Sequence, residues 1–264
     1  MSWVSDMTLS KHQCDLLMKQ LLIIGEQMIL CGSEIHRVED TVRRIGKAYG
    51  ALRTDIFAIN SCIFLAMEFP FFDEQTYTRR ITHGESTDYQ RLEKLNALSR
   101  SICWSPISPD ELELRVKEII SKKTSTTKFF IGSVLAASAF SLFFGGSYFD
   151  AIAAGIVAVL IALMQKYLAS YCPTAFFFTF PASLVSGIII YTTCSFLPFL
   201  HSDKVAIGDI MLLVPGIGIT TSVRNMLVGD TISGSLRFVE VLLQAAALAA
   251  GFMLAMAIAG GDLL

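Results

Sequence analysis

The stretch KKTSTTKFFIGSVLAASAFSLFFGG, residues 122–146, divides the chain into two parts of different composition. Residues 1–128 carry 34 of the 44 charged side chains, 17 basic and 17 acidic, whereas residues 129–264 carry 10 among long apolar runs. A helix needs about 20 mostly apolar residues to cross the hydrocarbon layer of a bilayer. The stretch therefore predicts the junction between a soluble head, residues 1–125, and a membrane domain, residues 126–264.

Five apolar runs in the second part are candidates for transmembrane helices, with four or six as the alternatives. They cover residues 129–146, 151–165, 174–200, 205–228 and 238–259. The second run is short unless Lys166 and Tyr167 extend it, and Asp209, Pro215 and Arg224 interrupt the fourth. The predicted fold is an α+β soluble N-terminal domain followed by an α-helical polytopic membrane domain of about five transmembrane helices.

Basic residues near the ends of the runs predict the orientation in the membrane. With the head in the cytoplasm, the outer loops hold Lys204 alone. The cytoplasmic flanks then hold Lys122, Lys123, Lys128, Lys166, Arg224 and Arg237. We therefore expect a cytoplasmic head and an outside C-terminus. Asp6, Asp15 and Glu26 in the N-terminal region argue against a cleavable signal peptide.

Helical and strand patterns alternate within the head. Apolar periodicity and helix-end signals predict helices over residues 10–31, about 33–50, 89–102 and 110–121. Runs of β-branched and aromatic residues predict strands in DIFAIN (55–60), SCIFLAMEF (61–69) and QTYTRRI (75–81). Glu26 is expected on the polar side of the first helix, away from its apolar stripe. About 120 residues with this alternation suffice for one small α+β domain.

Composition and motifs argue against several classes of function. A net charge of −2 and a balanced head give no surface for nucleic acid. The six cysteines form no C-x-x-C pair, so we expect free, mostly buried thiols, no metal site and no cofactor. The acidic and basic run from Glu34 to Asp40 predicts surface ion pairs rather than an active site. No catalytic motif is present, so we expect a non-enzyme; a membrane-anchored hydrolase or a ligand-sensing regulatory head is the alternative.

The strongest candidate site lies in VAIGDIMLLVPGIGITTSVRNMLVGDTISGSLRFVE, residues 205–240. Pro215 removes a backbone donor, and Gly216 and Gly218 relax the chain after it, so we expect the helix to break near its middle. Amides freed at the start of the second half-helix, with threonine hydroxyls nearby, would bind a carboxylate. A kink that serves packing alone is the alternative.

Two acids lie in or beside this region. Asp209 and Glu240 are costly in lipid, so each is a candidate for proton exchange unless it lies at a membrane interface. The last run is also one-sided on a helical wheel. One face carries Arg237, Glu240, Gln244, Ala247, Gly251 and Ala255. Polar and small residues on one side predict contact with protein or a cavity. A stripe of small residues between 179 and 187 predicts close helix packing.

Three ordered segments resemble the bacterial threonine/serine exporter family. They are CGSEIHRVEDTVRRIGKAYG (31–50), RITHGESTDYQRLEKLNALSRSI (80–102) and LVPGIGITTSVRNMLVGDTISGSLR (213–237). The similarity covers nearly all of the chain and is to the family's N-terminal module, a soluble domain plus five spans. Its Pro-Gly, Arg and Gly-Asp positions match at Pro215, Gly216, Arg224, Gly229 and Asp230. Thr221 and Asn225 stand where Asn and Asp are commoner, so Asn225 offers no acid.

The resemblance implies a subunit of a secondary transporter in the bacterial cytoplasmic membrane. Its substrate would be a small carboxylate, either serine or threonine or a dicarboxylate such as succinate. It also implies a second, smaller membrane subunit of about five spans as partner; self-association of this chain is left open. The substrate-binding candidates are Pro215, Gly216, Gly218, Thr220, Thr221, Arg224 and Asn225. The proton-coupling candidates are Asp209 and Glu240, and the gating or structural candidates are Gly229, Asp230, Arg237 and Gln244.

Overall fold

The computed structural model describes residues 9–70, 72–82, 88–122, 125–172 and 174–259. The chain is mostly helical and contains one three-stranded sheet. It separates into two compact units. The first unit comprises residues 1–124 and 223–235, and the second comprises residues 125–222 and 236–264.

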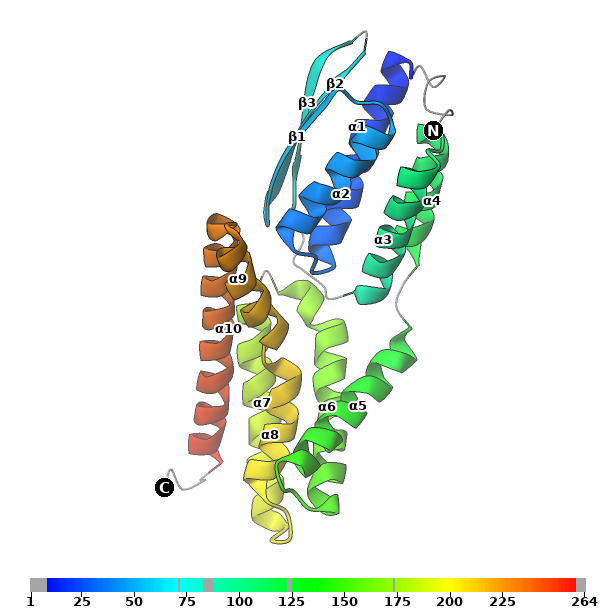
Figure 1. Ribbon diagram of the computed structural model, residues 1–264. Helices are drawn as coiled ribbons and strands as arrows, with labels where there is room; N and C mark the ends of the chain where they lie inside the picture. Colours follow the sequence, from blue (N-terminus) through cyan, green and yellow to red (C-terminus); the bar gives the residue numbers. More distant parts are fainter. Residues whose placement is uncertain (1–8, 71, 83–87, 123–124, 173, 260–264) are drawn as a thin grey trace. The chain divides into compact units, whose positions relative to one another are not determined.

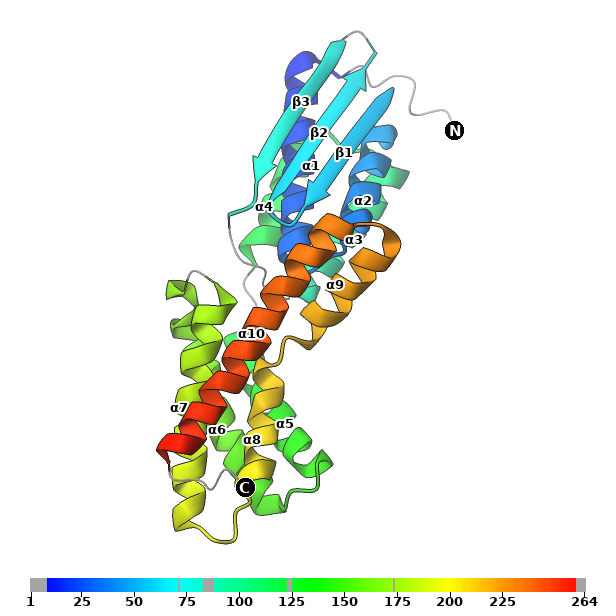
Figure 2. The ribbon, with the colours of Figure 1, turned by 90° about the vertical axis from the view of Figure 1, so that its left-hand side faces the viewer.

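The first unit is built in three layers (Figures 1 and 2). An antiparallel sheet of order β1-β2-β3 forms one outer layer, α1 and α2 form the middle layer, and α3 and α4 form the other. The strands are β1 (Arg53–Ile59), β2 (Cys62–Phe69) and β3 (Phe72–Arg80). The helices are α1 (Lys11–Leu30), α2 (Ile35–Ala48), α3 (Tyr89–Trp104) and α4 (Pro109–Ser121). All three predicted strands and all four predicted helices of this region are present.

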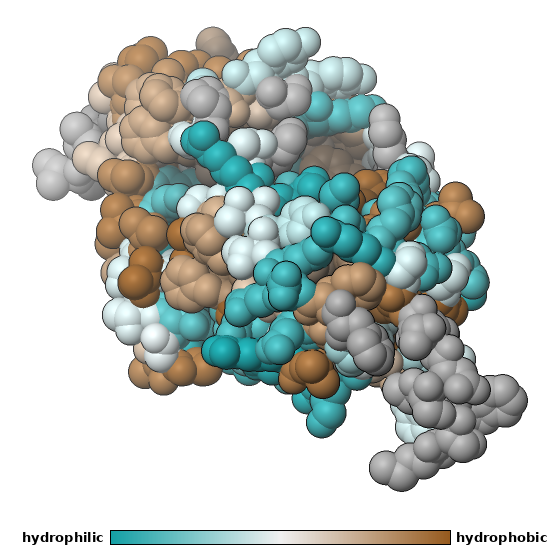
Figure 3. Space-filling model, turned by 90° about the horizontal axis from the view of Figure 1, so that it is seen from above, coloured by the Kyte–Doolittle hydropathy of each residue, from teal (hydrophilic) through white to brown (hydrophobic). Residues whose placement is uncertain are grey.

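Alternation along β2 directs its apolar residues to the middle layer. Ile63, Leu65 and Met67 are buried, while Phe64 between them is exposed and pairs with Phe57 on β1. In Figure 3, hydrophilic side chains cover much of the end of this unit that faces the viewer. The apolar core of the first unit lies on both sides of the middle layer, against the sheet on one side and against α3 and α4 on the other.

Helix α1 differs from the prediction, because it is buried on nearly all sides. Glu26, expected on a polar face, is only 7% exposed and accepts a 2.7 Å hydrogen bond from Nε of Arg79 on β3. The middle layer has neighbours on both sides, so a single apolar stripe does not describe it. The buried carboxylate is tolerated because an arginine pairs with it.

The predicted surface ion pairs of α2 are present. Glu34 pairs with Arg37 at 3.3 Å, and Asp40 pairs with Arg44 at 2.9 Å. Burial raises the pKa of the Cys31 thiol, which follows α1, to about 11. All six thiols are free, but only Cys14 and Cys31 are fully buried, so the expectation of mostly buried cysteines was too broad.

The second unit is helical. Its helices include α5 (Thr126–Phe143), α6 (Tyr148–Tyr167), α7 (Ala175–Phe196), α8 (Ser202–Leu213), α9 (Gly216–Val228) and α10 (Thr231–Ile258), with a 3-10 turn, η1, at Ala169–Tyr171. Residues 223–235, at the end of α9 and the start of α10, are grouped with the first unit. Four of the helices, α5, α6, α7 and α10, are long and apolar enough to cross a membrane. A fifth span results if α8 and α9, bent by 48° at a short break, count as one.

Helix ends account for the differences from the predicted runs. Ser147 caps α6, which therefore starts three residues early at Tyr148 and, at 20 residues, is long enough to span. Helix α7 ends at Phe196 rather than at residue 200, because Pro198 cannot continue it. Helix α10 starts at Thr231, directly after a turn at Gly229, whose φ of +108° suits glycine.

Small residues allow α7 and α10 to pack closely. A Cβ on Gly251 of α10 would lie 2.8 Å from the carbonyl oxygen of Phe180 on α7. A Cβ on Gly187 of α7 would lie 2.6 Å from the Cβ of Ala255 on α10. The close packing predicted for the α7 stripe is therefore confirmed at Gly187, and the predicted face of α10 contacts protein at Gly251 and Ala255.

Candidate functional site

The predicted break in the fourth apolar run is present between α8 and α9. Helix α8 ends at Leu213, and Val214 has extended backbone angles, φ −64° and ψ 126°. The residue before a proline is driven out of the helical region by the proline ring, which explains why the helix stops before Pro215. Helix α9 then starts at Gly216, so the chain is interrupted for two residues.

The first turn of α9 has backbone donors to spare. The amide of Gly216 donates to the carbonyl of Val214 at 2.9 Å, and that of Ile219 to Pro215 at 3.0 Å. The amides of Ile217 and Gly218 donate to no acceptor among the described residues. Two open N–H groups at a helix N-terminus, with the helix dipole behind them, favour an anion.

A guanidinium lies against this turn. A Cβ on Gly218 would lie 3.7 Å from Nη2 and 3.8 Å from Nε of Arg237 on α10, and 2.8 Å from Cγ2 of Val241. Glycine at position 218 therefore allows α9 to approach Val241 closely, and the Arg237 guanidinium lies at ordinary contact distance from the same position. Nη1 of Arg237 also donates to Glu240 at 3.2 Å. Open amides beside a guanidinium are a chemical match for a carboxylate.

The threonine hydroxyls contribute less than the sequence suggested. Thr220 donates to the carbonyl of Ile217 at 3.0 Å, and Thr221 donates to the same carbonyl at 2.8 Å. Ser222, also on α9, donates to Ile219 at 2.8 Å. These hydroxyl protons are engaged by the helix itself, so the donors facing an anion in this arrangement are the amides and the guanidinium.

The remaining substrate-binding candidates lie away from the break. Arg224 is eight residues beyond Gly216, or about 12 Å along the helix, and it forms an ion pair with Glu34. Asn225 is buried, and its carbonyl accepts the amide of Asp230 at 2.9 Å. Gly229 forms the turn between them, so Gly229 and Asp230 have a structural part in ending α9. Gln244 is half-buried in the middle of α10.

The two acids proposed for proton exchange have different surroundings. Asp209 on α8 has no exposed surface, and neither carboxylate oxygen has a hydrogen-bond partner among the described residues. The side chain of Glu240 on α10 is 63% exposed and pairs with Arg237. Within the described part of the chain, no three His, Cys, Asp or Glu side chains lie close enough to hold a metal ion.

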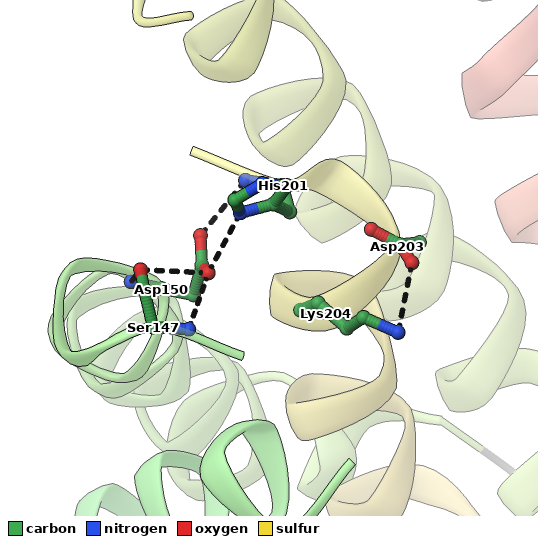
Figure 4. Close-up of polar contacts among 5 residues, drawn as sticks. All are labelled: Ser147, Asp150, His201, Asp203 and Lys204. Carbon is green, nitrogen blue, oxygen red and sulfur yellow. Dashed lines mark hydrogen bonds and ion pairs between the residues drawn. The ribbon is translucent and has the colours of Figure 1, made fainter. Parts of the chain in front are cut away.

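Sequence reasoning missed one polar cluster at the other end of α8 (Figure 4). Asp150 on α6 has no exposed surface and accepts the amide of Ser147 at 2.7 Å, the hydroxyl of Ser147 at 2.8 Å and the amide of His201 at 2.8 Å. Its carboxylate also lies 3.0 Å from Nδ1 of His201. The S-x-x-D spacing of residues 147–150, just before an apolar run, was the available signal.

The described part of the chain has four helices long and apolar enough to cross a membrane, and α8 and α9, counted together, give a fifth span that is broken beside the buried Asp209. These features define a multi-pass membrane protein. The chain belongs to the threonine/serine exporter family, whose profile matches residues 19–259. The resemblance seen in the three sequence segments is thereby confirmed. No curated protein and no solved structure matches the chain. Membership places it among membrane exporters.

Proposed function

We propose that this chain is a subunit of a secondary exporter for a small carboxylate metabolite. Serine and threonine are the first candidates, and a dicarboxylate such as succinate is the second. The observation that carries the proposal is the interrupted span, where the open amides of Ile217 and Gly218 lie beside Arg237. Interrupted helices within the hydrocarbon layer of a membrane occur where the backbone is buried in protein, lines a cavity or binds a substrate.

The substrate carboxylate would bind at the first turn of α9. Hydrogen bonds to a charged group are each worth about 1.5–3 kcal/mol, and the helix dipole adds about 0.3–1 kcal/mol. In this arrangement the backbone amides and Arg237 bind the substrate carboxylate. Gly216 and Gly218 have no side chain, so they leave space for the substrate beside the first turn of α9. Arg224 and Asn225, more than two turns beyond Gly216 along α9, would act on the path rather than at the binding turn.

The proposal includes a partner and an orientation. A module with five spans has its two ends on opposite sides of the membrane. A second module of about five spans that continued from the end of the first would therefore have the inverted orientation, as is common in transporters. We assign that second module to a partner subunit. Lys128 and Lys166, at the start of α5 and the end of α6, would face the cytoplasm, whereas Lys204 would face outside. The first unit would then be cytoplasmic.

Export from cells tests the proposal directly. Efflux of labelled serine, threonine and succinate is measured with this chain plus the second module, with this chain alone, and with neither. We expect faster efflux of at least one substrate when both are present. Equal efflux of all three substrates under all three conditions would contradict the proposal.

Substitutions connect the efflux to the break. Arg237→Gln should reduce transport by about tenfold or more, the worth of one hydrogen bond to a charged group, while Lys204→Gln should leave it unchanged. Pro215→Ala should reduce transport more than it reduces the amount of protein in the membrane. Pro181→Ala is the matched control, because Pro181 lies inside the continuous helix α7. Equal effects of Pro215→Ala and Pro181→Ala on transport would show that the break serves helix packing and not substrate binding.

A further inference from the structure

Asp209 lies at the centre of the buried face of α8. At 100° per residue, the buried residues Val205 and Leu213 lie on either side of it on the helical wheel. Helix α8 packs against α5, α6 and α7. The adjacent Gly208 marks how tight this packing is, since a Cβ there would lie 2.6 Å from the carbonyl oxygen of Ala137 on α5. The carboxyl group of Asp209 is therefore enclosed by helices.

The neighbouring helices offer this carboxyl group no counter-charge. The buried hydroxyls of α7 donate to carbonyls of their own helix: Thr179 to Ala175 at 2.9 Å, Ser183 to Phe180 at 2.9 Å and Ser186 to Ala182 at 2.7 Å. The titratable groups on α8 and the helices packed against it are Lys128, Tyr148, Asp150, Lys166, Tyr167, Tyr191, Cys194, Asp203 and Lys204. Only Asp150 among these is fully buried, and Ser147 and His201 occupy its oxygens.

An ionised carboxylate that is buried without a partner is so costly that such groups are found neutralised or bound to a cation. A metal cation takes several oxygen ligands, and no cluster of three acidic, His or Cys side chains exists among the described residues. A proton needs one carboxylate oxygen only. The surroundings of Asp209 thus suit a proton better than a metal ion.

We propose that Asp209 carries the coupling proton of export and that Glu240 does not. This inference rests on the proposed transport function. One carboxylate oxygen takes a proton from water on one side and releases it to water on the other, as one substrate molecule crosses in the opposite direction. Asp209 lies on α8, five residues before the break begins at Val214. A change in its charge therefore occurs in the half-helix that directly precedes the proposed substrate-binding turn of α9. Glu240 is exposed and paired with Arg237, which leaves it a positioning residue for that guanidinium.

Vesicles containing this chain and the second module test the coupling. The membrane potential is held at zero, a difference of one pH unit is imposed, and labelled threonine is followed. One-for-one exchange can sustain a concentration ratio of up to about tenfold. We expect Asp209→Asn to abolish this accumulation while exchange of labelled for unlabelled threonine continues. Asp203→Asn, an exposed acid on the same helix, should retain accumulation. Glu240→Gln should slow the uptake of threonine, because it changes the group that positions Arg237, but it should still reach the same final concentration ratio.

Three results would overturn the inference. The first is full accumulation of threonine by the Asp209→Asn variant. The second is loss of accumulation in the Glu240→Gln variant while the Asp209→Asn variant still accumulates threonine. The third is accumulation that is driven by a sodium gradient instead of a pH difference. Infrared difference spectra of the purified full chain give a second test that needs neither partner nor substrate. A pH-dependent carboxylic-acid band should be present in the wild type, absent in Asp209→Asn and shifted in Asp209→Glu. Absence of that band in the wild type would overturn the inference, and its presence would support Asp209 even if no substrate were transported.

Discussion

At the scale of single residues, the absence of a side chain decides how closely α7 and α10 approach. A Cβ at position 251 would lie 2.8 Å from the Phe180 carbonyl oxygen and 3.0 Å from the Cβ of Ser183. Both neighbours belong to a packed helix, and the carbonyl oxygen cannot rotate away. Even one added methyl group must therefore separate the helices.

Gly251→Ala should lower the stability of the purified full chain by about 1–3 kcal/mol, the usual cost of overpacking a closed contact. Gly132→Ala is the control, because a Cβ there has no heavy atom within 4 Å. That change should be neutral or stabilising by up to about 1 kcal/mol, as expected for glycine replaced by alanine in a helix. Unfolding midpoints in detergent measure both. Equal effects would show that the contact does not limit the approach of the helices.

At the scale of elements, Asp150 joins the start of α6 to the segment that leads into α8 (Figure 4). Its two oxygens accept from the cap of their own helix and from His201, 51 residues along the chain. A carboxylate at a helix N-terminus is also favoured by the dipole. The contact therefore fixes where α8 begins, at the opposite end from the break.

Asp150→Ala should destabilise the chain by about 1.5–3 kcal/mol, the worth of hydrogen bonds to a charged group. His201→Ala should cost less, because the backbone amide at that position still reaches Asp150. Asp203→Ala, which changes an exposed acid two residues beyond His201, should change stability by no more than about 0.5 kcal/mol. Thermal unfolding of the full chain in detergent compares the three. A loss for Asp203→Ala as large as that for Asp150→Ala would contradict the assignment.

At the scale of the whole molecule, each unit has its own apolar core. The core of the first unit is formed by residues from α1 to α4 and the sheet, and it includes none from 223–235. Large exposed apolar side chains, such as Leu135, Phe143 and Ile156, are numerous along the helices of the second unit, whereas the first unit has fewer, among them Leu52, Phe57 and Trp104. A core that is complete within one segment can fold without the rest of the chain.

A fragment of residues 1–124 should therefore be soluble and fold cooperatively in water without detergent. Its far-ultraviolet circular dichroism should show helix and strand, and its near-ultraviolet spectrum should be lost in a single thermal transition. Aggregation, or a near-ultraviolet spectrum without fixed structure, would contradict the division at residue 125. The complementary fragment, residues 125–264, should require detergent or lipid.

Local patterns determined the elements of this protein. Runs of β-branched and aromatic residues indicated the strands, and apolar length indicated the spans, because these signals depend on neighbours along the chain. Pro215 together with Gly216 and Gly218 predicted the break, since a proline disfavours the helical conformation at the residue before it and glycines relax the chain after it. Pro181, without such glycines, leaves α7 continuous. The family was also recognisable, because its motifs are contiguous in sequence.

Contacts between distant residues were decided only by the tertiary structure. Sequence spacing could not show that Arg237, which follows on the next helix, lies against the first turn of α9 at Gly218. It treated Asp209 and Glu240 alike, although only one of them is enclosed. It also missed the link between Asp150 and His201, which are 51 residues apart. Burial and pairing depend on which helices become neighbours, and no local pattern contains that information.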